Sequence, residues 1–259
     1  MAMAEPEFSV KLAETDAELR AAQRLRYEVF VQELGGGGAE VDHQNRLECD
    51  RFDPYFDHLL LLDNARMVEG APAVVGVYRL LRDDQAAKLG QFYSEGEYDL
   101  TVLKTSGRKL LELGRSCLAT DYRGGAAMFH LWNALAAYVF EHEIEILFGV
   151  ASFHGTDVAA LAQPLSMLHH NHLAPEDLRV RAQPTSAASM NLVAKDDLDR
   201  RKAMLEVPAL IKAYLRLGGC VGEGAFVDHA FNTTDVCLVM DTKRLNAKQK
   251  NIYTKGVAR

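Results

Sequence analysis

The sequence predicts an α/β protein in which helices cover a mixed sheet. Between residues 109 and 152 the pattern is strand, glycine turn, helix and strand, which is typical of a βαβ unit with two parallel strands and a right-handed crossover. Upstream, the apolar runs at residues 58–63 and 73–81 are separated by a turn around Asn64 and Glu69-Gly70 and indicate an antiparallel pair. A sheet of this kind has apolar faces to bury, so we expect helices against it.

The first helix is predicted over residues 14–34. Apolar residues recur at steps of three and four from Leu19 to Val29, and Thr15 or Asp16 can cap the start. Four consecutive glycines then favour a loop as far as Asp50, of the kind that often covers a substrate. The later elements expected are, in order, a strand at 109–118, a helix at 126–142, a strand at 144–152, helices at 156–169 and 207–217, and a last strand at 235–240.

One domain accounts for this order of elements better than two. The chain has 259 residues, of which 48% are hydrophobic, enough for one sizeable core. We expect a flexible N-terminus over residues 1–13, a single domain with a C-terminal extension over residues 14–242, and a polar tail over residues 243–259.

Charge and cysteine content argue against several classes of protein. The net charge of -7 argues against nucleic-acid binding in general, which draws on an excess of Lys and Arg. No apolar run approaches the roughly 20 residues that a membrane-spanning helix needs. The four cysteines are scattered, form no C-x-x-C pair and follow no secretory leader. We therefore expect reduced thiols in a cytoplasmic protein.

Two basic clusters can receive an anionic partner despite the acidic balance. They are Arg179, Arg181, Arg200, Arg201 and Lys202, and the pair Arg108 and Lys109. Because such clusters are commonly solvated faces, that interpretation stays open for both.

Two charged residues lie inside an apolar strand. Glu112 and Arg115 are three residues apart, and because an unpaired charge is costly to bury, they either pair or face a cleft. In an ideal strand the two point to opposite faces, and a bulge at Gly114 would bring them to the same face. A plain ion pair, of Glu112 with Arg115 or of Arg26 with Asp53, remains the alternative.

The turn at residues 123–125, Arg-Gly-Gly, lies where a strand passes into a helix. Its backbone N–H groups and the helix dipole can receive a phosphate. A Gly-Gly pair before a helix is also an ordinary turn, so the motif alone decides nothing.

Histidine and cysteine patterns indicate no further chemistry. His169, His170 and His172 are too tightly bunched to meet one metal ion from regular structure, so we expect a helix end or loop there and no metal site. Cys117, in an apolar strand, is expected to be a small core residue and not a nucleophile. No Gly-x-Ser-x-Gly motif supports serine hydrolysis.

These elements resemble two related groups of acyltransferases. The strand, the Arg-Gly-Gly turn and the helix resemble the acyl-donor site of the GNAT N-acetyltransferase fold. Residues 26–33, 50–53, 78–81 and 112–115 resemble the ordered motifs of acyl-homoserine-lactone synthases. Both resemblances imply a GNAT-like α/β fold, with a mostly antiparallel central sheet, a splayed parallel pair and flanking helices. Because Arg123 directly precedes the glycines, the turn suits the single phosphate of a phosphopantetheine arm.

A third resemblance is to the ornithine-acyl carrier protein N-acyltransferases of ornithine-lipid synthesis. It covers about residues 20–242 and is carried by GVASFHGTD at 149–157, PLSMLHHNHLAP at 164–175, PALIKAYLRLGG at 208–219 and DHAFNTTDV at 228–236. It implies transfer of a (3-hydroxy)acyl chain from acyl carrier protein to the α-amine of L-ornithine, giving lyso-ornithine lipid. Phosphopantetheine arrives on the donor, so no separate cofactor is expected. The lipid-like product implies peripheral contact with the inner membrane.

The mechanism assigns a role to each candidate residue. Glu112 is the candidate base for the attacking ammonium, and Arg115 holds the first helix or the substrate carboxylate. Asp50 and Asp53 are expected to bind the cationic side chain of ornithine, and Arg26 or Arg79 its carboxylate. The donor side comprises Ser116, Cys117 and Leu118, whose N–H groups stabilise the tetrahedral intermediate, and Arg123, Gly124 and Gly125, which hold the phosphate.

Two other functions stay open. A coenzyme A-dependent GNAT enzyme that acylates another amine would use the same turn and strand. A membrane-active toxin, which the hemolysin-like label of the third family suggests, would need a long amphipathic or spanning segment, and the sequence has neither.

Overall fold

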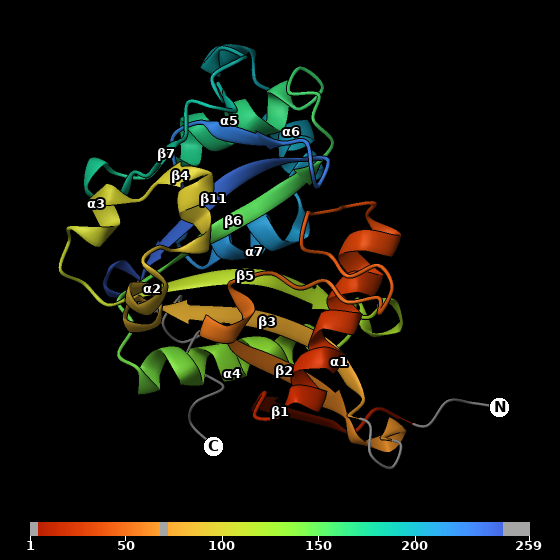
Figure 1. The fold of residues 1–259 in the computed structure, drawn as a ribbon. Helices are drawn as coiled ribbons and strands as arrows, with labels where there is room; N and C mark the ends of the chain where they lie inside the picture. The colour runs from red at the N-terminus through yellow and green to blue at the C-terminus, as the bar shows by residue number, and fades with distance from the viewer. Residues whose placement is uncertain (1–4, 68–71, 246–259) are drawn as a thin grey trace. The chain divides into compact units, whose positions relative to one another are not determined.

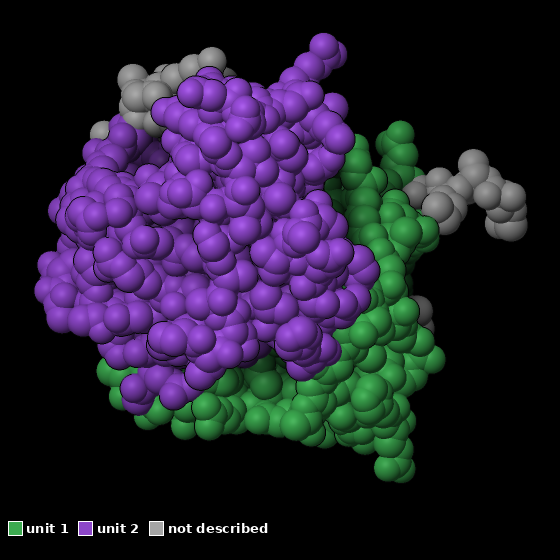
Figure 2. Space-filling view, turned by 90° about the horizontal axis from the view of Figure 1, so that it is seen from above, with its two compact units in different colours: residues 1–89, 113–142, 253–259 green, residues 90–112, 143–252 purple. Residues whose placement is uncertain are grey.

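The computed structural model describes residues 5–67 and 72–245 (Figure 1). The chain divides into two compact units, coloured separately in Figure 2. The first comprises residues 1–89, 113–142 and 253–259, and the second residues 90–112 and 143–252. Strand β5 (Leu110–Leu118) passes from the second unit into the first between Glu112 and Leu113.

The first unit contains β1 (Phe8–Leu12), β2 (Asp57–Asp63), β3 (Val74–Arg82), helix α2 (Asp83–Leu89) and the second part of β5. Strands β2 and β3 are antiparallel, which confirms the pair predicted from the two apolar runs. Strand β1 pairs antiparallel with β2 from Phe8↔Asp63 to Leu12↔Leu59.

Strand β1 corrects the prediction of a flexible N-terminus. Residues 8–12 are ordered by the ladder with β2, and the Phe8 ring also packs on Tyr122 and His130, with centroids 5.9 and 5.2 Å away. A five-residue strand is too short to show a period of its own, and its stability comes from the neighbouring strand. Residues 1–4 and, in the predicted polar tail, residues 246–259 lie outside the described residues.

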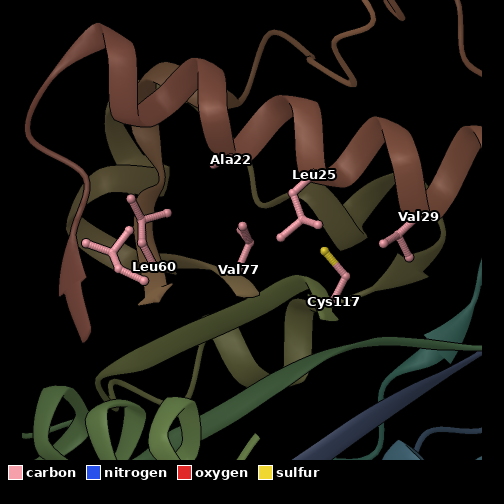
Figure 3. Close-up of a cluster of buried hydrophobic side chains, with 7 residues drawn as sticks. Ala22, Leu25, Val29, Leu60, Val77 and Cys117 are labelled. Atoms are coloured by element: carbon pink, nitrogen blue, oxygen red, sulfur yellow. The ribbon is translucent and has the colours of Figure 1, made fainter. Parts of the chain in front are cut away.

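Helix α1 (Asp16–Arg26) carries the first arginine of the site. Thr15 caps it through a capping box, in which the Thr15 hydroxyl accepts from the Glu18 N–H and the Glu18 carboxylate accepts from the Thr15 N–H. The chain continues as a π-helix at Tyr27–Glu33, so the predicted helix at 14–34 changes type halfway. The buried face packs into a core formed by Ala22, Leu25, Val29, Leu60, Leu62, Val77 and Cys117 (Figure 3).

Helix α4 (Ala127–Glu141), predicted at 126–142, packs on β1, β2 and β3 (Figure 1). Gly76 of β3 allows this close approach. A Cβ there would come within 2.7 Å of the Leu118 side chain and 3.0 Å of that of Leu131.

The second unit is built around β6 (Ile146–His154) and β11 (Thr233–Asp241), which are antiparallel over their whole length. The first part of β5 joins β6 in parallel, from Leu110↔Ile146 to Glu112↔Phe148. The remaining antiparallel strands are β8 (Ala187–Ala188), β9 (Cys220–Val221) and β10 (Ala225–Asp228), and a separate pair is β4 (Tyr98–Asp99) with β7 (Arg181–Ala182). A mostly antiparallel sheet with one parallel pair confirms the predicted fold class.

The helices of the second unit are α3 (Thr101–Lys104), α5 (Ala162–His172), α6 (Arg200–Glu206) and α7 (Ala209–Arg216). Helix α5 begins later than the predicted 156–169, because the Asp157 carboxylate accepts from the N–H groups of Ala159 and Ala160 and closes a turn first. The three histidines lie at the end of α5, as expected. Among the residues described, no helix combines the length and apolar character needed to cross a bilayer.

Candidate active site

Six charged side chains of the first unit meet in one cluster, which we call the ion cluster. It consists of Arg26 from α1, Glu48 and Asp50 from the following loop, Asp53 from the 3-10 turn Asp53–Tyr55, Arg79 from β3 and Arg115 from β5. Three guanidinium groups face three carboxylates, so the formal charges balance. Every predicted substrate-binding residue lies in this cluster, together with Arg115.

Arg26 lies at its centre and is fully buried. Its Nη1 and Nη2 donate to the two Asp53 carboxylate oxygens at 2.8 and 2.9 Å, while Nε donates to Glu48 Oε2 at 2.5 Å. Burial alone would lower the pKa of Arg26, but the charges of Glu48 and Asp53 outweigh it and raise the pKa. Arg26 therefore stays charged and anchors both acidic residues to α1.

Asp53 is saturated with donors. Its Oδ1 accepts from Arg26 and Arg79, and its Oδ2 accepts from Arg26 and Gln23, all at 2.8–2.9 Å. Burial raises the pKa of this carboxyl group, yet the charge and hydrogen bonds of Arg26 and the charge of Arg79 bring it well below its usual range. The predicted Arg26–Asp53 ion pair is thus present and buried.

Glu48 is a member of the cluster that sequence reasoning missed. Its carboxylate bridges two arginines, accepting from Arg26 at Oε2 and from Arg115 Nε at Oε1, 2.9 Å away. Burial raises its pKa, but Arg115, Arg26 and Arg79 lower it to about 2, so Glu48 is ionised at neutral pH. The signal available was an acidic residue just before Asp50, in a loop without periodicity.

Asp50 and Arg115 form the open edge of the cluster. Each side chain is 14% exposed, whereas the other four are at most 3% exposed. Arg115 Nη2 lies 3.9 Å from Asp50 Oδ2, too far for a hydrogen bond. One carboxylate and one guanidinium are therefore accessible side by side.

The backbone irregularity in β5 falls at Arg115 and not at the predicted Gly114. Arg115 has a φ of 51°, a left-handed conformation that costs a non-glycine residue about 1 kcal/mol. The bond from its Nε to Glu48 and the packing of its guanidinium 5.9 Å from the Phe30 ring centroid help to hold it there.

Glu112 belongs to the second unit and is 1% exposed. Its Oε2 accepts from the Tyr93 N–H at 2.7 Å, and its Oε1 accepts from the Ser94 N–H at 2.6 Å and from the Ser94 hydroxyl. These bonds tie β5 to the 3-10 turn Tyr93–Gly96. The role of Glu112 as base stays a prediction.

The predicted phosphate turn leads into α4. Gly124 is left-handed, with a φ of 77°, and no side chain among residues 5–67 and 72–245 caps the helix by accepting from its first N–H groups. Arg123 donates to Glu33 through Nη1 at 2.5 Å and Nη2 at 2.7 Å, and both side chains are 39% exposed. An incoming anion therefore competes with Glu33 for Arg123.

The residues before this turn divide by burial. Cys117 lies in the core beneath α1 (Figure 3), and burial raises the pKa of its thiol to about 12, which fits a core residue and not a nucleophile. Leu118 is buried beside α4. The Ser116 hydroxyl is buried and has no hydrogen-bond partner within the described chain.

The larger basic cluster predicted from sequence divides in two. Arg179 pairs with Glu176, and Arg181 pairs with Glu176 and Glu223, so their charges are largely offset. Both line a shallow pocket of about 270 Å³ together with Asp99, Thr101 and Val102. Arg200, Arg201 and Lys202 are exposed on α6 and have no carboxylate within 4.0 Å in residues 5–67 and 72–245. The second cluster is paired too, Arg108 with Asp241 and Lys109 with Glu143.

Comparison with known proteins agrees with this architecture. Residues 25–133 match the acetyltransferase (GNAT) domain family. The fold is similar to a solved coenzyme A-dependent acyl-homoserine lactone synthase, BjaI, with a TM-score of 0.54 and 14% identity over 96% of this chain and 89% of that one. It is also similar to an N-acyl amino acid synthase from uncultured soil microbes, with a TM-score of 0.50 and 11% identity over 95% of this chain and 98% of that one. The chain is an N-acyltransferase of the GNAT fold.

Relatives with more similar sequences identify the family within this class of acyltransferases. An L-ornithine N(alpha)-acyltransferase of Rhodobacter capsulatus is 62% identical over 257 residues, covering 99% of this chain and 98% of the relative. One of Brucella abortus is 42% identical over 248 residues, covering 95% of this chain and 88% of the relative. The chain belongs to the L-ornithine N(alpha)-acyltransferase family.

Proposed function

We propose that this enzyme transfers a (3-hydroxy)acyl chain from acyl carrier protein to the α-amine of L-ornithine, giving lyso-ornithine lipid in the first step of ornithine lipid biosynthesis. The names of its relatives support L-ornithine as the acceptor. The observation that carries the proposal is the open edge of the ion cluster. Asp50 and Arg115 there offer one carboxylate and one guanidinium to a substrate that carries charges of both signs.

The burial of the cluster supports one division of roles within it. Arg26, Asp53 and Arg79 are buried and bonded to one another, so they hold the cluster together. Arg115 binds the ornithine carboxylate and Asp50 binds its side-chain ammonium. This assignment narrows the set of four substrate-binding residues expected from sequence to Asp50. For Arg115 it selects one of the two roles expected from sequence, that of holding the substrate carboxylate.

The reaction forms an amide bond and breaks a thioester. The α-ammonium must lose a proton before it can attack, and Glu112, three residues before Arg115, accepts it directly or through water. The carbonyl oxygen gains charge in the tetrahedral intermediate, which the N–H groups of residues 116–118 stabilise. Collapse of the intermediate breaks the carbon–sulfur bond, and the pantetheine thiolate takes up a proton.

The donor side uses the start of α4. The phosphate of the phosphopantetheine arm binds the first N–H groups of the helix, beside Gly124 and Gly125, and draws Arg123 away from Glu33. A Cβ at either glycine would meet no atom within 4 Å, so the space beside them is open. Phosphopantetheine is part of the donor substrate, and no metal is assigned to the site.

A panel of donors and acceptors tests the proposal. Purified enzyme is incubated with acyl-loaded carrier protein or acyl-coenzyme A and with ornithine, lysine or glutamine, and products are identified by mass spectrometry. We expect Nα-acylornithine from acyl carrier protein. Faster transfer from acyl-coenzyme A to another amine would establish the alternative function instead.

The base has its own test. Glu112→Gln should keep the fold and lower turnover by roughly two to four powers of ten, the usual contribution of general acid–base catalysis. A folded variant with near-full turnover at pH 7 would make Glu112 a residue that only ties β5 to the turn at Tyr93–Gly96.

The product suggests where the enzyme works. Because an acylated ornithine partitions into the bilayer, we expect a cytoplasmic enzyme that contacts the inner membrane peripherally. Co-sedimentation with liposomes measures this contact, and activity indifferent to added lipid or detergent would count against it.

A further inference from the structure

Helices α6 and α7 of the second unit carry a concentration of positive charge. Residues 200–216 include five basic residues and one acidic residue, a formal charge of +4, whereas the whole chain carries -7. The five are Arg200, Arg201, Lys202, Lys212 and Arg216. Within residues 5–67 and 72–245, no carboxylate lies within 4.0 Å of any of them. By contrast, Arg108, Arg179 and Arg181 of the same unit each pair with a carboxylate.

An exposed leucine lies among these charges. Leu205 is 73% exposed, and because it follows Arg201 by four residues, the two lie on the same face of α6. Lys212 of α7 reaches the same part of α6, where its Nζ donates to the Leu205 carbonyl at 3.3 Å. Arg216 follows Lys212 by one turn and continues the basic face along α7. We call Leu205 and the five basic residues the α6–α7 surface.

The two kinds of side chain in this surface favour the same kind of partner. Leu205 gains free energy when a partner removes it from water, and the basic residues gain from carboxylates placed around it. An apolar centre with a charged rim is the usual anatomy of a protein interface. Because the chain is acidic overall, an acidic partner needs a local basic surface of this kind to approach it.

The acidic residues beside the α6–α7 surface favour a protein partner over a bilayer. Asp196 and Asp197 are exposed just before α6, and Glu206 is exposed at its end. An anionic bilayer presents a continuous negative plane and would repel all three carboxylates. A helix is only about 10–12 Å wide, so an acidic helix can meet the basic residues and leave the acidic ones in water.

We propose that the α6–α7 surface docks the acyl carrier protein, through an acidic helix of the carrier that has an apolar stripe. Leu205 packs on the stripe, and the five basic residues face the carboxylates on either side of it. The inference rests on the proposed function and deepens it, because it assigns a surface to the protein part of the donor, separately from the phosphopantetheine arm.

The experiment compares two donors in the full-length enzyme at saturating L-ornithine: acyl-loaded carrier protein, and acyl-phosphopantetheine, which has the same arm and acyl chain but no protein. Wild type should prefer the carrier in kcat/KM. Leu205→Glu places a charge of the partner's own sign at the centre of the surface and should reduce this preference roughly tenfold, through a higher KM for the carrier. The kcat/KM for acyl-phosphopantetheine should stay within about twofold, because the arm does not contact the surface.

Two further variants separate the roles of charge and apolar contact. Lys212→Glu should reduce the preference for the carrier by a few-fold and flatten its dependence on salt, because charges at the rim of an interface act mainly on the association rate. Phe140→Glu is the matched control, since Phe140 of α4 is also 73% exposed, and it should retain the wild-type preference. Thermal melting verifies the fold of each variant.

The outcomes separate the inference from the function. If wild type does not transfer acyl chains from the carrier protein to ornithine, the proposed function fails. If it does, and folded Leu205→Glu and Lys212→Glu keep the preference for the carrier or lose activity equally with both donors, the inference is overturned. Weaker binding of these variants to phosphatidylglycerol vesicles, with an unchanged KM for the carrier, would also overturn it and make the surface a membrane contact.

Discussion

Two arginine–carboxylate pairs of the first unit have nearly the same geometry and different surroundings. Arg26 and Asp53 form a two-bonded pair at 2.8 and 2.9 Å with side chains 0% and 3% exposed. Arg123 and Glu33 form one at 2.5 and 2.7 Å with both side chains 39% exposed. The shorter pair is the weaker one, because water and salt screen it and solvate its separated partners.

The difference in exposure explains why the Arg26–Asp53 pair stabilises the structure, whereas Arg123 of the other pair can bind a ligand. Removing one partner of a buried pair leaves an uncompensated charge and costs about 3–5 kcal/mol, whereas an exposed pair contributes at most about 1 kcal/mol. Arg123 can therefore exchange Glu33 for a phosphate at little cost. Arg26 cannot leave Asp53 without disrupting the cluster.

The largest expected effect breaks the buried pair. Asp53→Asn removes one charge of a carboxylate that accepts four hydrogen bonds and should lower the free energy of unfolding by about 3–5 kcal/mol. Urea denaturation measures the change, with Glu33→Gln as the matched control, expected to lose less than about 1 kcal/mol. Equal losses in the two variants would show that burial does not distinguish the pairs.

Lowering the pH tests the buried pair in another way, through the protonation of His58, which lies beside Asp53. Burial, followed by the charge of Arg26, lowers the pKa of His58 from 6.5, and its Nδ1 has no hydrogen-bond partner in the described chain. The neutral ring donates from Nε2 to the Asp53 carbonyl at 3.0 Å, whereas a protonated ring would bury an unpaired N–H. The folded state therefore binds fewer protons than the unfolded state just below pH 6.5, and stability falls as the pH falls.

The carboxylates of the cluster act in a lower pH window. The pKa of Glu48 falls from 4.5 to about 2, so its contribution is complete above pH 4.5 and is lost as the pH falls toward 2.

Unfolding free energies measured between pH 4.5 and 8 should decline below 6.5 in wild type and decline less steeply in His58→Gln. Because His169 and His172 also have lowered pKa values, some slope should remain. Identical slopes of unfolding free energy against pH in wild type and His58→Gln would show that His58 does not cause the loss of stability below pH 6.5.

The smallest expected effect concerns the exposed α6 charges. Reversal of Arg200 and Arg201 to Glu should raise the KM for acyl carrier protein by a few-fold and flatten its salt dependence, leaving the KM for ornithine unchanged. The effect is small because Asp196, Asp197 and Asp199 in the same segment already offset these charges. A salt titration of kcat/KM decides the matter: parallel slopes in variant and wild type would make the cluster a solvated face.

Sequence reasoning predicted the fold better than the interactions within the site. The βαβ unit and the antiparallel pair showed clear periods, so β2, β3, β5, β6 and α4 were found within a few residues. Strand β1 was missed because five residues carry little periodic signal. The resemblance to lactone synthases named Arg26, Asp50, Asp53, Arg79 and Arg115, but not which of them are buried.

The rest depends on contacts between residues far apart in the chain. Glu48 has no local pattern, and its role exists only because folding brings it to Arg26 and Arg115. The sequence placed a possible bulge at Gly114, and the structure instead has a left-handed residue at Arg115, where the Glu48 bond helps to hold it. At Glu48 and at Arg115, tertiary contacts and not the local sequence determine the role or the backbone conformation of the residue.

One kinetic comparison tests the central claim, that the ion cluster binds the amino acid and the α4 turn binds the acyl donor. Arg115→Gln and Arg123→Gln make the same chemical change at the two places. Arg115→Gln should raise the KM for L-ornithine roughly ten- to hundred-fold and leave that for acyl carrier protein nearly unchanged, and Arg123→Gln should do the reverse. If both substitutions raise the same KM, or neither raises either, the division of the site into these two parts is wrong.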